Sequence, residues 1–394
     1  MFTHARRYTI QNVNLQSLAG IYIHIPFCRQ ACTYCNFHFS TSMKLKDEFL
    51  AALHTEISYP DDFIDAAEKI ETIYFGGGTP SLLAIEELEA ILTTVRKKFN
   101  VVPDAEITLE ANPDDISTLK VQQWMELGIN RLSLGIQSFD DAELKWMNRA
   151  HTAEDSRRSI HEIKEAGIHN FSVDVIFGSP LLKDEVLEKT MQLIIDEQIT
   201  HVSCYALTAE PKTALHKMIA VNKTAAPDPE IQARQFLLIA DILQANGYDH
   251  YEISNYAKPG LRSKHNSSYW QGKPYHGFGA GAHAFNGKNK RRWNIANNAL
   301  YIQQLKNGIL PFEEETLNET QQLNEYVMTA LRTAEGINLS VVAQNFGVEK
   351  EQTLKNKISL DSFLKEKILL QNNHLLLTRE GKLFADGLAA ELFF

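Results

Sequence analysis

Three of the four cysteines of this 394-residue chain fall in one short segment. Cys28, Cys32 and Cys35 have the spacing Cys-x-x-x-Cys-x-x-Cys and directly follow a short apolar run. Three thiolates on one tight loop can converge on a metal centre, but they cannot complete the four-cysteine shell of an ordinary iron–sulfur cluster. Structural zinc sites are normally closed by four ligands arranged in pairs, and the fourth cysteine, Cys204, lies far away in the sequence. The spacing therefore indicates a [4Fe–4S] cluster with one iron open to a small ligand.

The simplest alternative is that the three cysteines are small buried hydrophobes, as free cysteine often is. Chance clustering of three out of four cysteines in so short a window is improbable, so we interpret them as ligands. The low number of cysteines also indicates a reducing compartment.

Composition limits the class of protein. With 44% hydrophobic and 22% charged residues, the chain has the make-up of a soluble globular protein large enough for two or three domains. Its net charge of −10 argues against a partner held mainly by phosphate contacts, so we do not expect nucleic-acid binding. No stretch approaches the roughly 18–20 apolar residues of a membrane span, and residues 1–8 lack the apolar core of a secretory signal. We predict a cytoplasmic protein.

Short β-rich runs alternate with amphipathic helical segments through the first half of the chain. The strands are predicted at Ile21–Ile25, Thr72–Phe75, Glu106–Glu110, Arg131–Gly135, Phe171–Phe177 and His201–Leu207. The helices between them are predicted at Leu45–Ser58, Ile85–Phe99, Ile116–Leu127, Ala153–Ala166 and Val186–Glu197. Such alternation implies parallel strands with right-handed crossovers, so the pattern predicts an α/β fold. Six units are typical of a partial (β/α)6 barrel, and a doubly wound sheet is the alternative; in both, ligands collect at the carboxyl ends of the strands.

Residues suited to ligand binding follow the predicted strands. A glycine-rich turn that includes Gly77, Gly78 and Thr79 follows the second strand, where glycines let the backbone approach a ligand closely. Glu110 ends the third strand, and its carboxylate suits hydroxyl or ammonium donors. Asp174 lies inside an apolar strand, where a carboxylate is costly without a partner. Taken singly, each has a structural alternative, namely a tight loop, a surface acid or a satisfied core polar group. Their common location at strand ends favours one site.

The cysteine motif resembles that of the radical S-adenosylmethionine (SAM) superfamily. In that superfamily the open iron binds the amino and carboxylate groups of SAM, and one electron from the cluster cleaves SAM to methionine and a 5′-deoxyadenosyl radical. Tyr34, between the last two cysteines, also fits the superfamily pattern.

Further motifs resemble the HemN/HemW branch of this superfamily, which contains oxygen-independent coproporphyrinogen III oxidases and heme-trafficking chaperones. In chain order they are Tyr22-x-His24-Ile-Pro-Phe-Cys28, Gly76-Gly-Gly-Thr79-Pro, Glu110-x-Asn112-Pro113, Asn130-Arg131-x-Ser-x-Gly-x-Gln137-Ser-Phe and Asn148-Arg149-x-His151. The resemblance covers the chain from Gly20 onward. It implies the following SAM contacts: Tyr22 against the SAM site, Gly77, Gly78 and Thr79 at the methionine end, Glu110, Gln137, Arg149 and Asp174 at polar groups, and backbone near Ala206 at the adenine. The fork of Arg149 suits a carboxylate.

One departure separates the two subgroups of this branch. The oxidases carry a further cysteine two positions beyond the last cluster cysteine, where this chain has Phe37. The chaperone subgroup is more similar at this position. The chain also contains His265-Asn-Ser-Ser-Tyr269-Trp270, which resembles a heme-binding element of that subgroup. Histidine is a standard ligand of heme iron, so His265 is the candidate heme ligand, with an ordinary polar loop residue as the alternative.

We predict four segments: a lead-in over 1–20, a radical SAM partial barrel over 21–215, an extension over 216–312, and a small winged-helix-like α+β domain over 313–394. The last is predicted from helical stretches around a short hairpin at Leu369–Leu377, and it resembles the C-terminal module of the HemN/HemW branch.

Three functions follow from the resemblance. The first is a heme chaperone that binds heme and passes it to recipient proteins. The second is an oxygen-independent coproporphyrinogen III oxidase, which converts propionates to vinyl groups. The third is a radical SAM enzyme with another substrate, so whether the chain is an enzyme stays open. The implied cofactors are a [4Fe–4S] cluster, SAM and heme, and the implied partners include a reductant such as flavodoxin or ferredoxin. Peripheral membrane association and oligomeric state also stay open.

Overall fold

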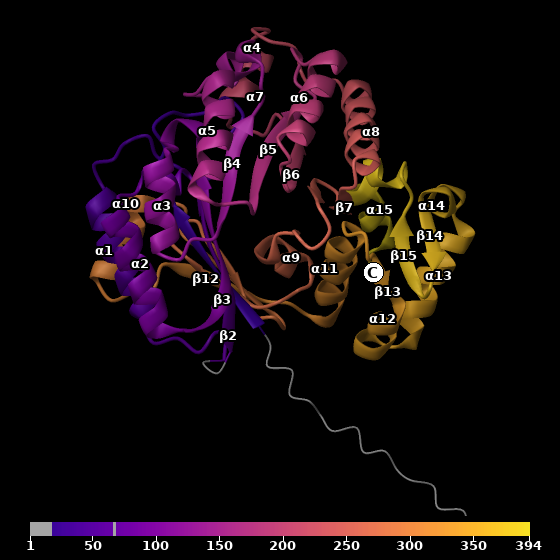
Figure 1. Ribbon diagram of the computed structural model, residues 1–394. Helices are drawn as coiled ribbons and strands as arrows, with labels where there is room; N and C mark the ends of the chain where they lie inside the picture. The colour runs from indigo at the N-terminus through magenta and orange to yellow at the C-terminus, as the bar shows by residue number, and fades with distance from the viewer. Residues whose placement is uncertain (1–17, 66–67) are drawn as a thin grey trace, which may run out of the picture.

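The computed structural model describes residues 18–65 and 68–394, and its centre is a sheet with six consecutive parallel strands (Figure 1). These strands are β1 (Leu18–Ile25), β2 (Lys69–Gly77), β3 (Asn100–Ala111), β4 (Arg131–Gln137), β5 (Phe171–Phe177) and β6 (His201–Ala206). Each predicted strand lies within or nearly coincides with one of them, and they pair in chain order, β1 to β6. The predicted α/β partial-barrel architecture is confirmed.

Helices connect the parallel strands and cover one side of the sheet. They are α1 (Lys46–Ser58), α2 (Ile85–Lys98), α3 (Thr118–Glu126), α4 (Asp141–Trp146), α5 (Ala153–Ala166) and α6 (Asp184–Asp196). Apolar strand residues such as Ile21, Ile23 and Ile25 are fully buried in one core with helix residues such as Phe49 and Leu88. Burial of this apolar surface is the main force that holds the helices on the sheet.

The other side of the sheet carries polar side chains. Successive side chains of a strand point to opposite faces, so the residues between the core isoleucines form a second set. In β1 to β6 this set includes Tyr22, Thr72, Tyr74, Glu106, Thr108, Glu110, Arg131, Ser133, Asp174, His201 and Ser203. Most of these side chains are buried or half-buried. The inner face therefore carries polar side chains that need hydrogen-bond or ligand partners, whereas the outer face packs into the hydrophobic core.

The extension lengthens the sheet at both edges, giving the strand order β12-β11-β10-β9-β1-β2-β3-β4-β5-β6-β8-β7. The added strands are β7 (Asp249–Glu252), β8 (Asn255–Ala257), β9 (Tyr275–Phe278), β10 (His283–Phe285), β11 (Lys290–Asn294) and β12 (Phe312–Thr316). The helices of this part are α7 (Ala214–Ala220), α8 (Pro229–Ala245), α9 (Lys264–Trp270) and α10 (Asn298–Lys306). The glycine-rich segment that begins at Gly277 contains the end of β9, which pairs in parallel with β1, and the turn into β10.

The C-terminal residues form a separate hydrophobic core around a three-stranded antiparallel sheet. Its elements are α11 (Glu319–Leu331), β13 (Ile337–Asn338), α12 (Leu339–Phe346), α13 (Val348–Leu360), α14 (Ser362–Lys367), β14 (Ile368–Gln371), β15 (His374–Leu377) and α15 (Ala385–Leu392). Asn372 and Asn373 both have positive φ and close the predicted hairpin, which suits a tight two-residue turn.

The predicted segment boundaries can be compared with these elements. The boundary at residue 313 lies inside β12, which pairs with β11, so the separate C-terminal core begins with α11. Residues 1–17 of the predicted lead-in lie outside the described residues, and residues 18–20 belong to β1. An ion pair links the C-terminal core to the sheet: the guanidinium Nη2 of Arg332 lies 3.0 Å from the buried carboxylate of Glu252. Among the described helices, none is both long and apolar enough to cross a membrane.

Candidate functional site

A cavity of about 410 Å³ opens at the carboxyl ends of the parallel strands. Its volume lies within the range of small-molecule sites. The sequence-predicted residues that line it are Cys28, Cys32, Cys35, Gly77, Gly78, Thr79, Glu110, Gln137, Arg149, Asp174 and Ala206. These residues come from loops and strand ends spread over the first half of the chain, and the parallel sheet brings them together. Tyr22 and His265 are not among the lining residues.

The cysteine loop follows β1 and is held by main-chain hydrogen bonds on both sides. The Cys28 N–H donates to the Ser40 carbonyl at 3.0 Å, and the Thr33 N–H donates to the Met147 carbonyl at 3.0 Å. The Asn148 side-chain amide donates to the Ala31 carbonyl at 2.7 Å. The loop therefore has a defined shape before any ligand binds.

Arg149 ties this loop to two strand ends. Its Nη1 donates to the Cys32 sulfur at 3.2 Å, and its Nη2 donates to the Asn112 side-chain oxygen at 2.7 Å and the Gly135 carbonyl at 2.8 Å. The Arg149 Nε is buried and has no hydrogen-bond partner within the described part of the chain. A metal centre requires its cysteines in the thiolate form.

Burial acts against that thiolate form. It raises the pKa of the Cys28 thiol, which a hydrogen bond from Thr79 partly offsets, and it raises the pKa of the Cys35 thiol to about 11. Both thiols are therefore protonated near neutral pH unless a metal centre replaces the proton. Among the described residues, no three His, Cys, Asp or Glu side chains are grouped to hold a single metal ion. A cluster differs from a single ion because each cysteine binds a different iron, and a thiol-only donor set suits it.

The glycine turn after β2 packs so closely that side chains are excluded. A Cβ added to Gly78 would lie 2.7 Å from the carbonyl oxygen of Phe27 and 2.9 Å from that of Ile25. Gly77 has φ of 107°, and a Cβ there would lie 2.6 Å from the ring of His24. The turn therefore presents main-chain groups to the cavity and lies directly against the start of the cysteine loop.

Two half-buried carboxyl groups face the cavity. Glu110 accepts from the Tyr74 hydroxyl at 2.8 Å and from the Gly77 N–H at 3.2 Å. Burial raises the pKa of Glu110 to about 7, and burial likewise raises that of Asp174 to about 6 despite hydrogen bonds from Ser203 and Ser133. The two carboxyl groups repel each other when ionised, so a cationic ligand placed near them would be favoured.

Gln137 ends β4 in a strained conformation. Its φ is 70°, which non-glycine residues seldom adopt, and the pairing of β4 with β5 is irregular between Leu134 and Gln137. Strain of this kind concentrates at ligand sites. It turns the end of β4 so that Gln137 and Gly135 both line the cavity.

His265 lies in a helix, whereas the alternative to heme ligation treated it as an ordinary polar loop residue. It is in α9, its side chain is fully buried, and its two ring nitrogens lie 2.8 Å from the Thr72 hydroxyl and 2.7 Å from the Tyr269 hydroxyl. The ring also stacks on Tyr74, and burial lowers its pKa to about 3, so it is neutral. As the structure stands, neither nitrogen is free to bind a heme iron.

Tyr22 occupies the layer behind the cavity. Its hydroxyl hydrogen-bonds to the His24 ring at 3.1 Å, and its ring stacks on Tyr74 with centroids 6.1 Å apart. Tyr22 therefore lies one side chain away from the cavity and supports Tyr74, which lines it.

Several lining residues were missed by the sequence reasoning. They are Tyr74, Ser133, Ser203, Tyr205 and Asn266. A usable signal existed for two of them, because Tyr74 and Ser133 lie two positions before Gly76 and Gly135, near the carboxyl ends of their strands, and so share the inward face. Asn266 reaches the cavity from α9 through a long-range contact that strand periodicity does not reveal.

The rim beside the cysteines is apolar and exposed. Phe37 is 67% exposed and lines the mouth of the cavity together with Phe39. An aromatic side chain left in water at the mouth of a polar cavity favours a role in contacting a partner or ligand.

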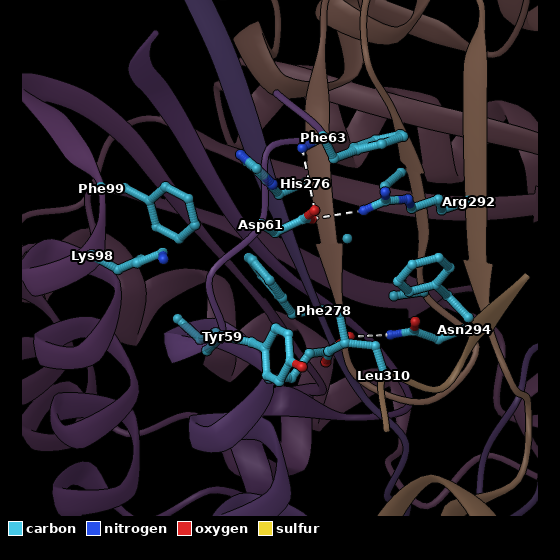
Figure 2. Close-up of a pocket in the computed structure, with 16 residues that line it drawn as sticks. Tyr59, Asp61, Phe63, Lys98, Phe99, His276, Phe278, Arg292, Asn294 and Leu310 are labelled. Atoms are coloured by element: carbon cyan, nitrogen blue, oxygen red, sulfur yellow. Dashed lines mark hydrogen bonds and ion pairs between the residues drawn. The ribbon is translucent and has the colours of Figure 1, made fainter. Parts of the chain in front are cut away.

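A second hollow, of about 50 Å³, lies between the ends of α1 and α2 and the strands β9 to β12 (Figure 2). The guanidinium of Arg292 lies 4.1 Å from the ring centre of Phe63 and 4.2 Å from that of Phe312, and it contacts Asp61 at 2.7 Å. This volume accommodates a few water molecules, not a cofactor. In the part of the chain that the structure describes, none of the residues predicted to bind SAM or heme lines it.

Comparison with known proteins agrees with this geometry. Residues 22–194 match the family model of the radical SAM superfamily, and residues 317–384 match that of the HemN C-terminal domain. The heme chaperone HemW of Bacillus subtilis is 33% identical over 94% of this chain and 97% of its own length. That of Mycobacterium tuberculosis is 32% identical over 95% of this chain and 94% of its own. The solved structure of coproporphyrinogen III oxidase (HemN) from Escherichia coli has the same fold, with a TM-score of 0.83 at 20% identity over 96% of this chain and 90% of that one.

Proposed function

The chain belongs to the HemW family of radical SAM proteins, and we propose that it is a heme chaperone, which binds heme and transfers it to recipient proteins. The observation that carries this proposal is the likeness to relatives named heme chaperones over nearly the whole chain, 33% identical over 94% of it in one case. A likeness of this extent includes the cavity, the extension and the C-terminal core, so it supports a shared function rather than a shared domain.

For the cofactors, we assign the three cysteines of the loop to three irons of a [4Fe–4S] cluster, with the fourth iron open to SAM. Their thiol chemistry, their common cavity and the Arg149 donor beside Cys32 support this assignment. Cys204 lies in β6, fully enclosed between β5 and β8, and takes no part. When bound, the cluster supplies the electron for cleavage of SAM.

The remaining cavity residues would hold SAM. The main chain of Gly77, Gly78 and Thr79 would receive its methionine end, because this turn lines the cavity and its close packing against Phe27 leaves no room for a side chain at Gly78. The other polar contacts are assigned to Glu110, Gln137, Arg149 and Asp174, and the adenine contact to the main chain near Ala206. The unpartnered Arg149 Nε supports a ligand in its vicinity. We assign Tyr22 a positioning role, through Tyr74.

Phe37 favours the chaperone over the oxidase. The oxidase subgroup resembled by the sequence has a cysteine at this position, whereas here an aromatic ring, 67% exposed, lies at the mouth of the cavity. Such a ring can cover part of a porphyrin. Ligation of heme iron by His265 stays a prediction, and it requires the ring to leave Thr72 and Tyr269. Cytoplasmic location and the identity of recipient and reductant also stay predictions.

An anaerobic assay separates the chaperone from the oxidase. The reconstituted protein is incubated with SAM, a reductant and either heme or coproporphyrinogen III. We expect stable binding of heme and no protoporphyrinogen. Formation of protoporphyrinogen with matching 5′-deoxyadenosine would make the protein an oxidase and refute the proposal. The Phe37→Cys variant, assayed in parallel with the unchanged protein, tests the position that distinguishes the two subgroups.

A further inference from the structure

Four exposed lysines lie in or beside the two helices that are hydrogen-bonded to the cysteine loop. Lys145 is in α4, Lys217 in α7, and Lys212 and Lys223 lie just before and after α7. Within residues 18–65 and 68–394, none of the four makes an ion pair, whereas many other lysines and arginines do. Residues 211–227 contain three lysines and no aspartate or glutamate, in a chain whose net charge is −10. We call this surface the lysine face.

The lysine face is joined to the cysteine loop by main-chain hydrogen bonds. The Thr33 N–H donates to the carbonyl of Met147, at the end of α4, and the Thr33 carbonyl accepts from the Leu215 N–H, in the first turn of α7, at 2.7 Å. Thr33 directly follows Cys32 in the chain. Each of the two helices of the lysine face is therefore hydrogen-bonded to the residue that directly follows Cys32, one of the cysteines assigned to the cluster.

Packed side chains fill the space between the helices and the loop. Tyr34 lies in a small hydrophobic cluster with Trp146, Met147 and Leu215. The Trp146 indole N–H donates to the Thr224 hydroxyl at 3.2 Å, which holds the turn carrying Lys223 against α4. In Figure 1, α4 and α7 lie together at the edge of the sheet where the strands β4 to β6 end. Electrons tunnel farther through packed groups of this kind than through water.

From these observations we propose that the lysine face docks a small acidic one-electron carrier protein, which reduces the cluster through the Thr33–Tyr34 segment. This inference depends on the cluster assigned under the proposed function. With a flavodoxin-type carrier, the anionic flavin hydroquinone loses one electron and becomes the neutral semiquinone. The oxidised cluster gains that electron, and no bond or proton has to move. Redox complexes of this kind are small and transient, and opposite charges speed their formation.

Charge complementarity selects this occupant. An acidic carrier would be attracted to these unpaired lysines on a protein whose net charge otherwise repels it, which favours encounters at the face that leads to the cluster. Exposed Val221, 72% accessible, adds an apolar contact in the same turn. A second copy of this chain, itself acidic, is the competing occupant, and it is distinguished by measuring the oligomeric state.

The test compares two triple variants of the full chain. In the first, Lys212, Lys217 and Lys223 are each replaced by glutamate. In the second, Lys97, Lys189 and Lys365 are replaced in the same way, so that the net charge is equal; all three are exposed, belong to other elements and make no ion pair within the described residues. Binding of an acidic flavodoxin is followed by flavin fluorescence on protein without the cluster. Reduction of the reconstituted cluster by flavodoxin hydroquinone is followed by electron paramagnetic resonance.

At low salt, we expect the first variant to bind flavodoxin at least about tenfold more weakly than the second. We expect its cluster to be reduced by flavodoxin hydroquinone at least about tenfold more slowly. Both should reduce equally well with dithionite and bind heme equally. Equal binding by the two variants, or loss of a dimer in the first with unchanged flavodoxin binding, would overturn the lysine-face proposal. Absence of a cluster signal even with dithionite would instead contradict the cluster assignment, while the binding comparison still decides the lysine face.

Discussion

Acidification from pH 8 to pH 6 should weaken SAM binding because two half-buried carboxyl groups line the cavity assigned to SAM. Burial raises the pKa of Glu110 to about 7 and that of Asp174 to about 6. SAM carries positive charge on its sulfonium and ammonium groups, so the ionised carboxylates attract it and the neutral acids do not. Each carboxyl group that takes up a proton before SAM binds must release it when SAM binds.

The magnitude follows from the ionised fractions. With a pKa of about 7, Glu110 is roughly 90% ionised at pH 8 and roughly 10% at pH 6, which gives about a tenfold loss of affinity. Asp174, with a pKa of about 6, adds about twofold. The total is about twentyfold, or about 2 kcal/mol of binding free energy.

Stability should change with pH in the opposite direction. The folded-state pKa of Glu110 is raised above its ordinary value, so the folded SAM-free protein binds the proton more tightly than the unfolded chain does. This contribution to stability is fully present below the unfolded pKa and is lost as the pH rises through about 7. On acidification, SAM affinity should therefore fall while the contribution of Glu110 to the stability of the SAM-free protein rises. This combination distinguishes a specific loss of SAM affinity from acid denaturation.

Anaerobic calorimetry with SAM at pH 6, 7 and 8 measures this dependence on reconstituted protein. Glu110→Gln should retain only about the twofold dependence that Asp174 contributes. Glu56→Gln is the matched control, because Glu56 is also a buried carboxyl group with a raised pKa but bonds to Gly279, Asn294 and Tyr301 away from the cavity. An affinity that is constant from pH 6 to pH 8, or full pH dependence in Glu110→Gln, would refute the reasoning.

Three further predictions concern the cluster, α9 and the glycine turn. Alanine at any cysteine of the loop should abolish iron and sulfide binding on anaerobic reconstitution, whereas Cys204→Ala should keep both; the reverse pattern would contradict the ligand assignment. His265→Ala removes two buried hydrogen bonds and leaves a cavity, so urea unfolding should show a loss of about 2–4 kcal/mol; unchanged heme affinity and absorption spectrum in this variant would exclude it as the heme ligand. Gly78→Ala forces a Cβ to within 2.7 Å of the Phe27 carbonyl, so SAM affinity and cluster retention should fall, while Gly387→Ala, with open space around it, should leave both unchanged.

The parallel sheet could be predicted because its signals are local. β-rich runs such as Phe171–Phe177 alternate with amphipathic helices, and each run lies within a strand or nearly coincides with one, although β3 begins six residues before its predicted start. Once the strands are parallel, their carboxyl ends must meet at one edge, which is why Glu110 and Asp174 could be placed in one cavity although they are far apart in the sequence.

Contacts between distant segments could not be predicted. Glu106 accepts hydrogen bonds from the N–H groups of Lys264 and His265, and this contact draws α9 onto the polar inner face of the sheet. Nothing in the local pattern around His265 indicates that it would be enclosed, and the alternative to heme ligation treated it as an ordinary polar loop residue. The positive φ of Gln137 likewise depends on an irregular pairing between β4 and β5, which composition does not encode.

Transfer of bound heme tests the central claim most directly. The reconstituted protein is loaded with one equivalent of heme under anaerobic conditions, separated from free heme, and mixed with apomyoglobin, and the absorption spectrum of holo-myoglobin is followed with time. The chaperone function predicts that the protein retains heme through the separation and then passes it to the acceptor. Failure to retain heme, together with conversion of coproporphyrinogen III by the same preparation, would contradict it.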